Sequence, residues 1–126
     1  MIKKVTILLS IKPKFVEKIL NGEKCFEYRK RIPEHSIDKL IIYSSSPVCK
    51  VVGEAEIEKI LFDTPENIWH ITKYQSGIGS EFFFEYFKDK KVAYAYKLKN
   101  IKKYFPPRKL SDYGLKTAPQ SFSYIK

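Results

Sequence analysis

The sequence predicts an α+β fold, namely a small, mostly antiparallel β-barrel. One helix follows the first strand, and two helices are inserted before the last long strand. Short apolar or alternating runs indicate five or six strands. Capped amphipathic runs interrupt these strands at only two places. No strand leads into the Gly-rich turn of a parallel nucleotide-binding unit. We expect one domain over residues 1–126, because a chain of 126 residues buries one core and is too short for two.

The first half of the chain predicts three strands around one helix. Pro13 suits the first turn of a helix, and Asn21-Gly22 supplies the left-handed backbone that ends one. The run after this helix carries its charges on a strand-like pattern, and a turn containing Pro33 closes it. The predicted elements are a strand at 3–10, a helix at 12–22, and strands at 23–30 and 38–45.

The second half predicts two long strands separated by two helices. Glu54, Glu56 and Glu58 alternate with apolar residues, as a half-exposed antiparallel strand requires, and Gly53 indicates a bulge or corner. Thr64 is a good N-cap for the next helix. The predicted elements are a strand at 49–62, helices at 64–74 and 80–89, a strand at 91–104, and a Pro-bounded tail that packs across the domain.

The net charge of +10 favours a polyanionic partner, above all nucleic acid. A lysine-rich composition alone is the alternative explanation. However, only three of the 24 basic residues are Arg, and Arg29 and Arg31 lie together in one segment. Arg presents a planar fork that suits phosphates and base edges. The apolar run near the N-terminus is too short for a signal peptide or a membrane span, so we expect a cytoplasmic protein with reduced cysteines and no membrane partner.

The charged segment 24–31 is the strongest candidate for a site. In a regular strand Glu27, Arg29 and Arg31 share one face, so Glu27 and Arg29 can pair or converge on one ligand. The alternative is an exposed pair worth under ~1 kcal/mol. Lys12 stands before the first helix, where backbone N–H groups favour an anion. It either holds a phosphate or carboxylate there or is a solvated loop lysine.

These residues resemble the ASCH domain family of the PUA-like superfamily. The run GEKCFEYR fits the pattern G-x-K-x-x-E-x-R, and the resemblance continues through LIIYSSSPVCKVVGEAEI, FFFEYFKDKKVAYAYKL and PQSFSYI. It implies a PUA-like barrel that binds RNA in a cleft between the first helix and the barrel. By this resemblance the cleft holds Lys12, Lys24, Glu27 and Arg29, with Ser44, Ser45 and Ser46 in a neighbouring loop.

Some proteins similar to this family are enzymes. One branch deacetylates N4-acetylcytidine with a Lys, a Thr three residues later and a more distant Glu. Lys24 matches the first position, whereas Glu27 stands in the Thr position and no Glu occurs near YQSGIGS before Glu81. Ribonuclease activity is also attributed to this family. Glu27 as general base with Lys24 or Arg29 stabilising charge would suit that chemistry.

The sequence therefore predicts an RNA-binding domain that takes RNA or a nucleotide-like ligand, including a modified nucleotide. The alternatives are a ribonuclease or modified-nucleoside amidohydrolase with Lys24 and Glu27 as catalytic residues, and a protein-interaction or transcription-coregulator module. We expect no cofactor and no metal site, because His35, His70 and the two cysteines lack ligand spacing. The expected ligand-binding residues are Lys12, Lys24, Glu27, Arg29, Arg31, Ser44, Ser45, Ser46, Gln120 and Ser121.

Overall fold

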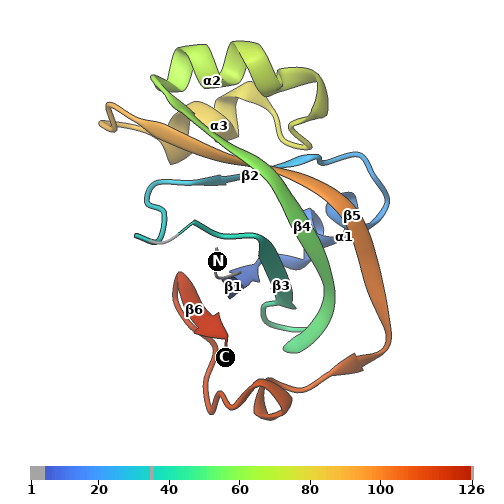
Figure 1. Cartoon of the computed structure of the whole chain (residues 1–126). Coiled ribbons are helices and arrows are strands. Elements are labelled where there is room, and N and C mark those ends of the chain that lie inside the picture. Colours follow the sequence, from blue (N-terminus) through green and yellow to red (C-terminus); the bar gives the residue numbers. More distant parts are fainter. Residues whose placement is uncertain (1–4, 35, 126) are drawn as a thin grey trace.

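The structure is a computed structural model that describes residues 5–34 and 36–125 (Figure 1). In chain order its elements are β1 (Thr6–Ile11), α1 (Pro13–Leu20), β2 (Phe26–Arg29), β3 (Lys39–Ser44), β4 (Lys50–Asp63), α2 (Pro65–Thr72), η1 (Lys73–Gln75), α3 (Ser80–Tyr86), β5 (Ala93–Arg108), η2 (Leu110–Tyr113) and β6 (Phe122–Ile125).

The strands form one mixed sheet in the order β2-β5-β4-β3-β1-β6, which curls into a half-barrel (Figure 1). The pair β1–β3 is parallel, and the other strand pairs are antiparallel. The long strands β4 and β5 run together and bend with the sheet. The predicted α+β architecture of a curled, mostly antiparallel sheet with inserted helices is confirmed.

Local signals fix where α1 and α2 begin. Pro13 is the first residue of α1, and Gly22 follows that helix with a φ of 88°. Thr64 caps α2 by accepting a hydrogen bond from the Asn67 backbone N–H at 3.3 Å. Each helix therefore begins where the sequence predicts it.

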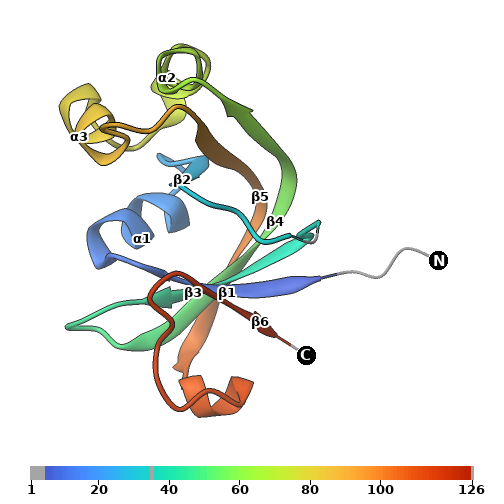
Figure 2. The same ribbon diagram turned by 90° about the vertical axis from the view of Figure 1, so that its left-hand side faces the viewer.

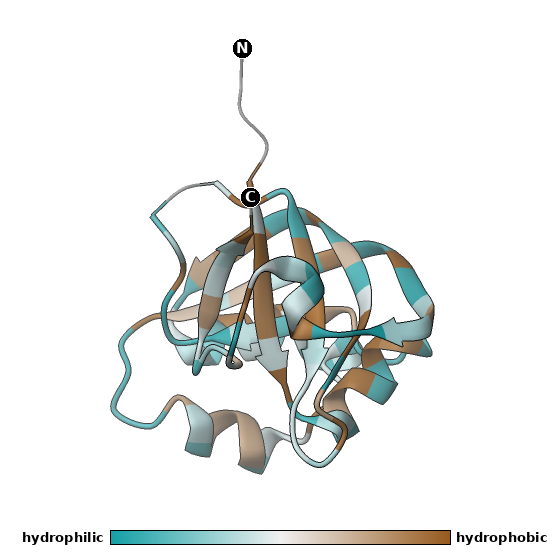
Figure 3. Ribbon diagram, turned by 90° about the horizontal axis from the view of Figure 1, so that it is seen from below, coloured by the Kyte–Doolittle hydropathy of each residue, from teal (hydrophilic) through white to brown (hydrophobic). Residues whose placement is uncertain are grey.

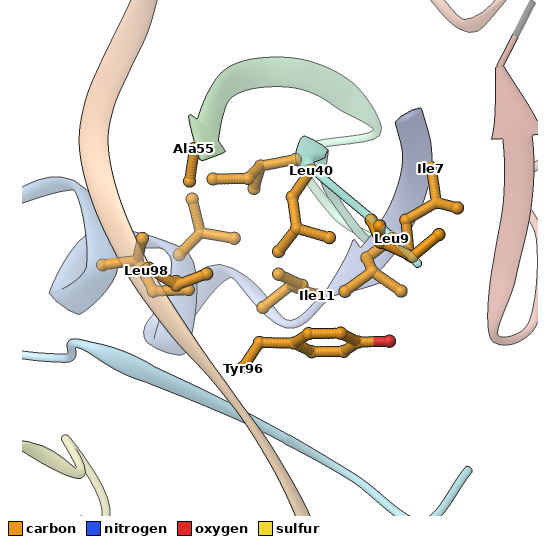
Figure 4. Close-up of a cluster of buried hydrophobic side chains, with 11 residues drawn as sticks. Ile7, Leu9, Ile11, Leu40, Ala55, Tyr96 and Leu98 are labelled. Carbon is orange, nitrogen blue, oxygen red and sulfur yellow. The ribbon is translucent and has the colours of Figure 1, made fainter. Parts of the chain in front are cut away.

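Hydrophobic residues alternate with hydrophilic ones along much of the sheet (Figure 3), whereas β1 and β3 bury side chains on both of their faces. Figure 4 shows the main core, where Ile11 and Leu40 lie over the ring of Tyr96. A second apolar cluster, which includes Phe83 and Phe87, joins α2 and α3 to the far end of the sheet. The sheet and the helices thus pack around the segment between β1 and β3.

The predicted second strand is too long at its N-terminal end. The Lys24 N–H donates to the Lys18 carbonyl at 3.0 Å, and the Cys25 N–H donates to the Gln75 carbonyl at 2.9 Å. These two N–H groups therefore bond to the last turn of α1 and to the end of η1 instead of to a strand. β5 is longer than predicted, and the tail adds the strand β6. No helix among the described residues is long and apolar enough to cross a bilayer.

Candidate functional site

A cavity of ≈ 180 Å³, called the cleft below, opens between α1, β2 and α3. Figure 2 shows α1 and α3 on the same side of the sheet, near its edge strand β2. The cleft has a charged floor from the segment around β2 and aromatic walls from the two helices. Its lining residues are Ser10, Ile11, Lys12, Phe15, Lys24, Glu27, Tyr28, Arg29, Ile78, Phe82 and Tyr86.

Lys24 is the most deeply buried cation of the cleft, with only 2% of its surface exposed. Its ammonium group donates to the Ser76 carbonyl at 2.8 Å and lies 4.6 Å from the ring centroid of Tyr28. Burial lowers the pKa of Lys24 to about 8, and this outweighs the nearby Glu27 carboxylate, which acts in the opposite direction. Lys24 therefore has an amine that loses its proton close to neutral pH.

Glu27 and Arg29 form a largely buried ion pair, which is one of the two arrangements that their spacing on the strand allows. The Oε2 atom of Glu27 accepts from both Nη2 and Nε of Arg29, at 2.6 and 3.0 Å. Arg29 Nη2 also donates to the Ser10 carbonyl at 3.0 Å. Burial is the largest single influence and lowers the pKa of Arg29, but the charge and hydrogen bonds of Glu27 and the nearby tyrosines together outweigh it, so the pKa is raised. Arg29 thus remains charged and is held in one orientation.

Tyr28 lines the cleft, and its ring lies against the Lys24 ammonium group. The Thr72 hydroxyl donates to the Ile68 carbonyl at 2.7 Å, so its single proton is already used. The Tyr28 hydroxyl, 2.7 Å from Thr72 Oγ1, must then be the donor in that contact. Burial raises the pKa of Tyr28 to about 12, so Tyr28 remains a neutral donor at neutral pH.

Aromatic side chains form the walls, and they were not predicted, because the helical spacing of the FFFEYF segment is more typical of core residues. Phe15 of α1 meets Phe82 of α3 edge to face, with ring centroids 5.3 Å apart. Phe83 and Phe87 are indeed core residues, whereas Phe82 and Tyr86 line the cleft. The sequence did contain a signal for this wall: Phe82 and Tyr86 are four residues apart, and residues four apart on a helix share a face.

Arg31 does not line the cleft. It lies beyond the end of β2 and is exposed. The chain leaves the sheet after Arg29, so the alternation that would have placed Arg31 beside Glu27 stops there. Lys12, in contrast, stands exposed at the mouth of the cleft.

The loop that carries Ser44, Ser45 and Ser46 neighbours the cleft, but none of these serines lines it. Ser44 is buried at the end of β3, and Ser46 is exposed. The Ser45 N–H donates to the Ile11 carbonyl at 2.9 Å, which ties this loop to the strand that leads to Lys12.

The C-terminal tail reaches the edge of the cleft at one point. The Ser10 hydroxyl donates to the Pro119 carbonyl at 2.7 Å. Gln120 and Ser121, the tail residues expected to bind ligand, are exposed and are not lining residues.

The described part of the chain contains no group of three or more His, Cys, Asp or Glu side chains that could hold a metal ion. His35, one of the residues considered for a metal site, lies outside the described residues. The lining residues of the cleft offer an amine, a carboxylate–guanidinium pair and aromatic surfaces.

Several proteins of other names are similar in sequence to this chain. ATP synthase subunit alpha and large ribosomal subunit protein uL22 of Ureaplasma parvum serovar 3 are each 31% identical, over 99% and 96% of this chain. The chain spans only 16% and 39% of their respective lengths. An ASCH domain-containing ribonuclease of Zymomonas mobilis is 29% identical over 74% of this chain, which covers 64% of that protein.

Two further comparisons identify the family. The crystal structure of ASCH from Zymomonas mobilis superposes with a TM-score of 0.87 at 25% identity, covering 96% of this chain and 87% of that one. Residues 4–115 match the family described as "Domain of unknown function (DUF365)". The resemblance to ASCH domains is thus confirmed in both sequence and structure. The chain belongs to the DUF365 family and is an ASCH domain of PUA-like fold.

Proposed function

We propose that this domain binds RNA and takes one nucleotide unit of it into the cleft. The observation that carries the proposal is the convergence of Lys24, Glu27 and Arg29 on one cavity with aromatic walls. A cavity of ≈ 180 Å³ is smaller than the roughly 300–1,000 Å³ of pockets for drug-sized ligands. It therefore suits a single base or sugar rather than several stacked nucleotides.

Each part of the cleft matches a part of a nucleotide. The rings of Phe15 and Phe82 offer apolar surface for a base that has left its stack. Glu27 uses Oε2 for Arg29, so its Oε1 is the oxygen that can accept a hydrogen bond from a base or ribose. Lys12 at the mouth is placed to meet a phosphate outside.

The comparisons support an RNA-related role. One relative is named a ribonuclease and another a ribosomal protein, although the third is named an ATP synthase subunit. The net charge of +10 acts in the same direction, because it attracts polyanions over a long range.

The second candidate function is RNA cleavage, which the lowered pKa of Lys24 favours. A lysine with a pKa of about 8 can act as a general base near neutral pH. The neutral amine of Lys24 would take the proton of a ribose 2′-hydroxyl while the oxygen attacks phosphorus and the bond to the 5′-oxygen breaks. The leaving oxygen takes a proton from water, and a 2′,3′-cyclic phosphate remains. Arg29 would stabilise the added negative charge.

The test compares wild type with Lys24→Met, which keeps the length of the side chain and removes its amine. Lys90→Met, an exposed lysine of the turn before β5, is the matched control. Binding and integrity of a short labelled RNA are measured together, and deacetylation of N4-acetylcytidine is measured separately. We expect RNA binding that weakens in Lys24→Met and not in the control.

The outcomes separate the alternatives. RNA cleavage that vanishes in Lys24→Met would make the domain a ribonuclease, and loss of deacetylation would make it an amidohydrolase. Binding of RNA that is equal in all three proteins would show that the cleft takes another ligand, such as a peptide, and would contradict the proposal.

A further inference from the structure

A second basic surface lies at the end of β5, in the lower part of Figure 1, away from α2 and α3. We call the segment 102–108 the β5 bulge. Together with Asp112 it lines an open groove of ≈ 560 Å³, and none of its residues lines the cleft. The Asp112 carboxylate accepts from the Lys109 N–H at 3.0 Å and so begins η2.

The bulge follows from the pairing of β4 with β5. Gly53 pairs with Lys103, whereas Val51 pairs with Arg108, so Val52 alone faces the four residues 104–107. A β-carbon at Gly53 would stand 2.7 Å from the Lys102 carbonyl oxygen, so only glycine allows the two strands to approach there. The extra residues must leave the ladder, and bulges of this kind redirect side chains.

The bulge divides its aromatic residues between core and solvent. Tyr104 is 3% exposed and packs in a cluster with Leu8 and Val51, whereas Phe105 is 93% exposed. A single exposed apolar residue is ordinary. Phe105 is unusual because lysines and an arginine surround it in sequence and in the groove.

Among the described residues no acidic side chain forms an ion pair with a cation of the bulge, although the Glu54 carboxylate interacts with Lys102 and Arg108 at longer range. Farther along the β4–β5 ribbon, Lys97 pairs with Glu58 at 3.0 Å. No described residue forms an ion pair with Lys103 or Arg108. Arg108 is also fixed in place, since its guanidinium lies 3.7 Å from the ring centroid of Tyr104 and its Nη1 donates to the Tyr113 hydroxyl at 2.9 Å.

We propose that the β5 bulge is a second RNA-binding surface, which takes a single strand with one base stacked on Phe105. Neighbouring phosphates contact Lys102, Lys103 and Arg108. Exposed rings flanked by cations bind unstacked nucleic acid in this way, because every base has a π-face and every linkage has a charge. A duplex hides its base faces, so the strand must be single.

The inference rests on the proposed function only in the class of ligand, RNA. Its consequence is that the domain recognises a stretch of RNA longer than the unit that fits the cleft. Affinity should therefore rise with RNA length beyond what the cleft alone explains.

The experiment measures fluorescence anisotropy with oligouridylates of about 4 to about 20 nucleotides, a range that brackets the site sizes of single-strand binding domains. The variants are Phe105→Ala and the double change Lys102→Gln/Lys103→Gln. Phe62→Ala, another phenylalanine that is 69% exposed, is the matched control. All four positions are exposed, so thermal unfolding should be unchanged and is measured to confirm it.

We expect Phe105→Ala to weaken the longest RNA about tenfold, within the usual range for one stacked base. The double lysine change should reduce the slope of log affinity against log salt by about 1.4, or about 0.7 for each phosphate that is no longer neutralised. Phe62→Ala should bind as wild type does. Binding by Phe105→Ala and the lysine variant that equals this control would overturn the inference, as would equal displacement of the RNA by polyglutamate.

The two proposals fail separately. Binding of long RNA that depends on Phe105 but not on Lys24 would leave the bulge as the RNA site and refute the cleft. Dependence on Lys24 alone would do the reverse. A wild type that binds no RNA of any length would refute both.

Discussion

Gly77 lies directly against Lys24, so closely that a β-carbon at Gly77 would stand 2.5 Å from the Lys24 Cβ. Gly77 also has a φ of 69°, which favours glycine. Its carbonyl accepts from the Lys18 ammonium at 3.0 Å, and the preceding carbonyl, of Ser76, accepts from Lys24. The loop 76–79 is thus fitted against the very side chain that forms the floor of the cleft.

Gly77→Ala should therefore displace Lys24 or the loop. Gly114→Ala is the control, because Gly114 has a φ of 75° and a β-carbon there would meet nothing within 4 Å. Left-handed backbone alone should cost the control about 1–2 kcal/mol of unfolding free energy. Gly77→Ala should lose a further ~1–3 kcal/mol, the usual cost of overpacking. Urea denaturation measures both, and equal losses would show that the contact with Lys24 is not tight.

The lowered pKa of Lys24 predicts that stability rises with pH. The folded value of about 8 lies below the ordinary 10.5, so between these values the unfolded chain binds a proton that the folded chain does not. Stability should increase across this window, by about 2 kcal/mol between about pH 7 and about pH 9.5.

The measurement is the unfolding free energy of wild type minus that of Lys24→Met at each pH, which cancels the other titrating groups. The pH series should stop below about pH 9.5, because tyrosines in the unfolded chain ionise at about pH 10. A difference that does not change with pH would show that Lys24 has an ordinary pKa in the folded protein.

The Glu27–Arg29 pair should be costly to break from one side. Glu27→Gln leaves a buried guanidinium without its counter-charge, and we expect a loss of about 2–4 kcal/mol in unfolding free energy. Adding Arg29→Met to Glu27→Gln should recover part of that loss, since the isolated charge is then gone.

Glu58→Gln is the control for this prediction. It breaks the exposed ion pair with Lys97 and should cost under about 1 kcal/mol. Were Glu27→Gln as mild as this control, the pair in the cleft would be solvated rather than buried.

Tyr28→Phe removes the hydrogen bond that Tyr28 donates to Thr72 and keeps the ring beneath Lys24. We expect a loss of about 1 kcal/mol, the usual net value of such a bond. Tyr74→Phe, at a position that is 90% exposed, should change nothing. Thermal unfolding of both variants checks whether this hydrogen bond stabilises the fold, and no difference between them would contradict it.

Local signals in the sequence predicted the elements that depend on local chemistry. The Pro13 helix start and the Thr64 cap are examples, because their partners lie within a few residues. β6 was missed because it is a strand only through its pairing with β1, far away in the chain. The end of β5 was missed because Pro106 and Pro107 argue against a strand, and only the bulge accommodates them.

The same distinction applies to the site. Strand spacing predicted that Glu27 and Arg29 lie on one face, where they could pair or converge on one ligand, and the sequence motif pointed to Lys24. The walls were not predicted, since Phe82 meets Phe15 only after α3 has packed beside α1. The position of Gln120 was taken from a family resemblance without geometry, and this residue is exposed outside the cleft.

The pairing of β1 with β6 sets Thr6 opposite Ile125 in register. The described chain thus enters and leaves at one edge of the sheet, where neighbouring strands lie about 5 Å apart. Separating β6 from β1 would therefore also release Thr6 from Ile125, so the ladder that completes this edge of the sheet also holds these two distant parts of the chain together.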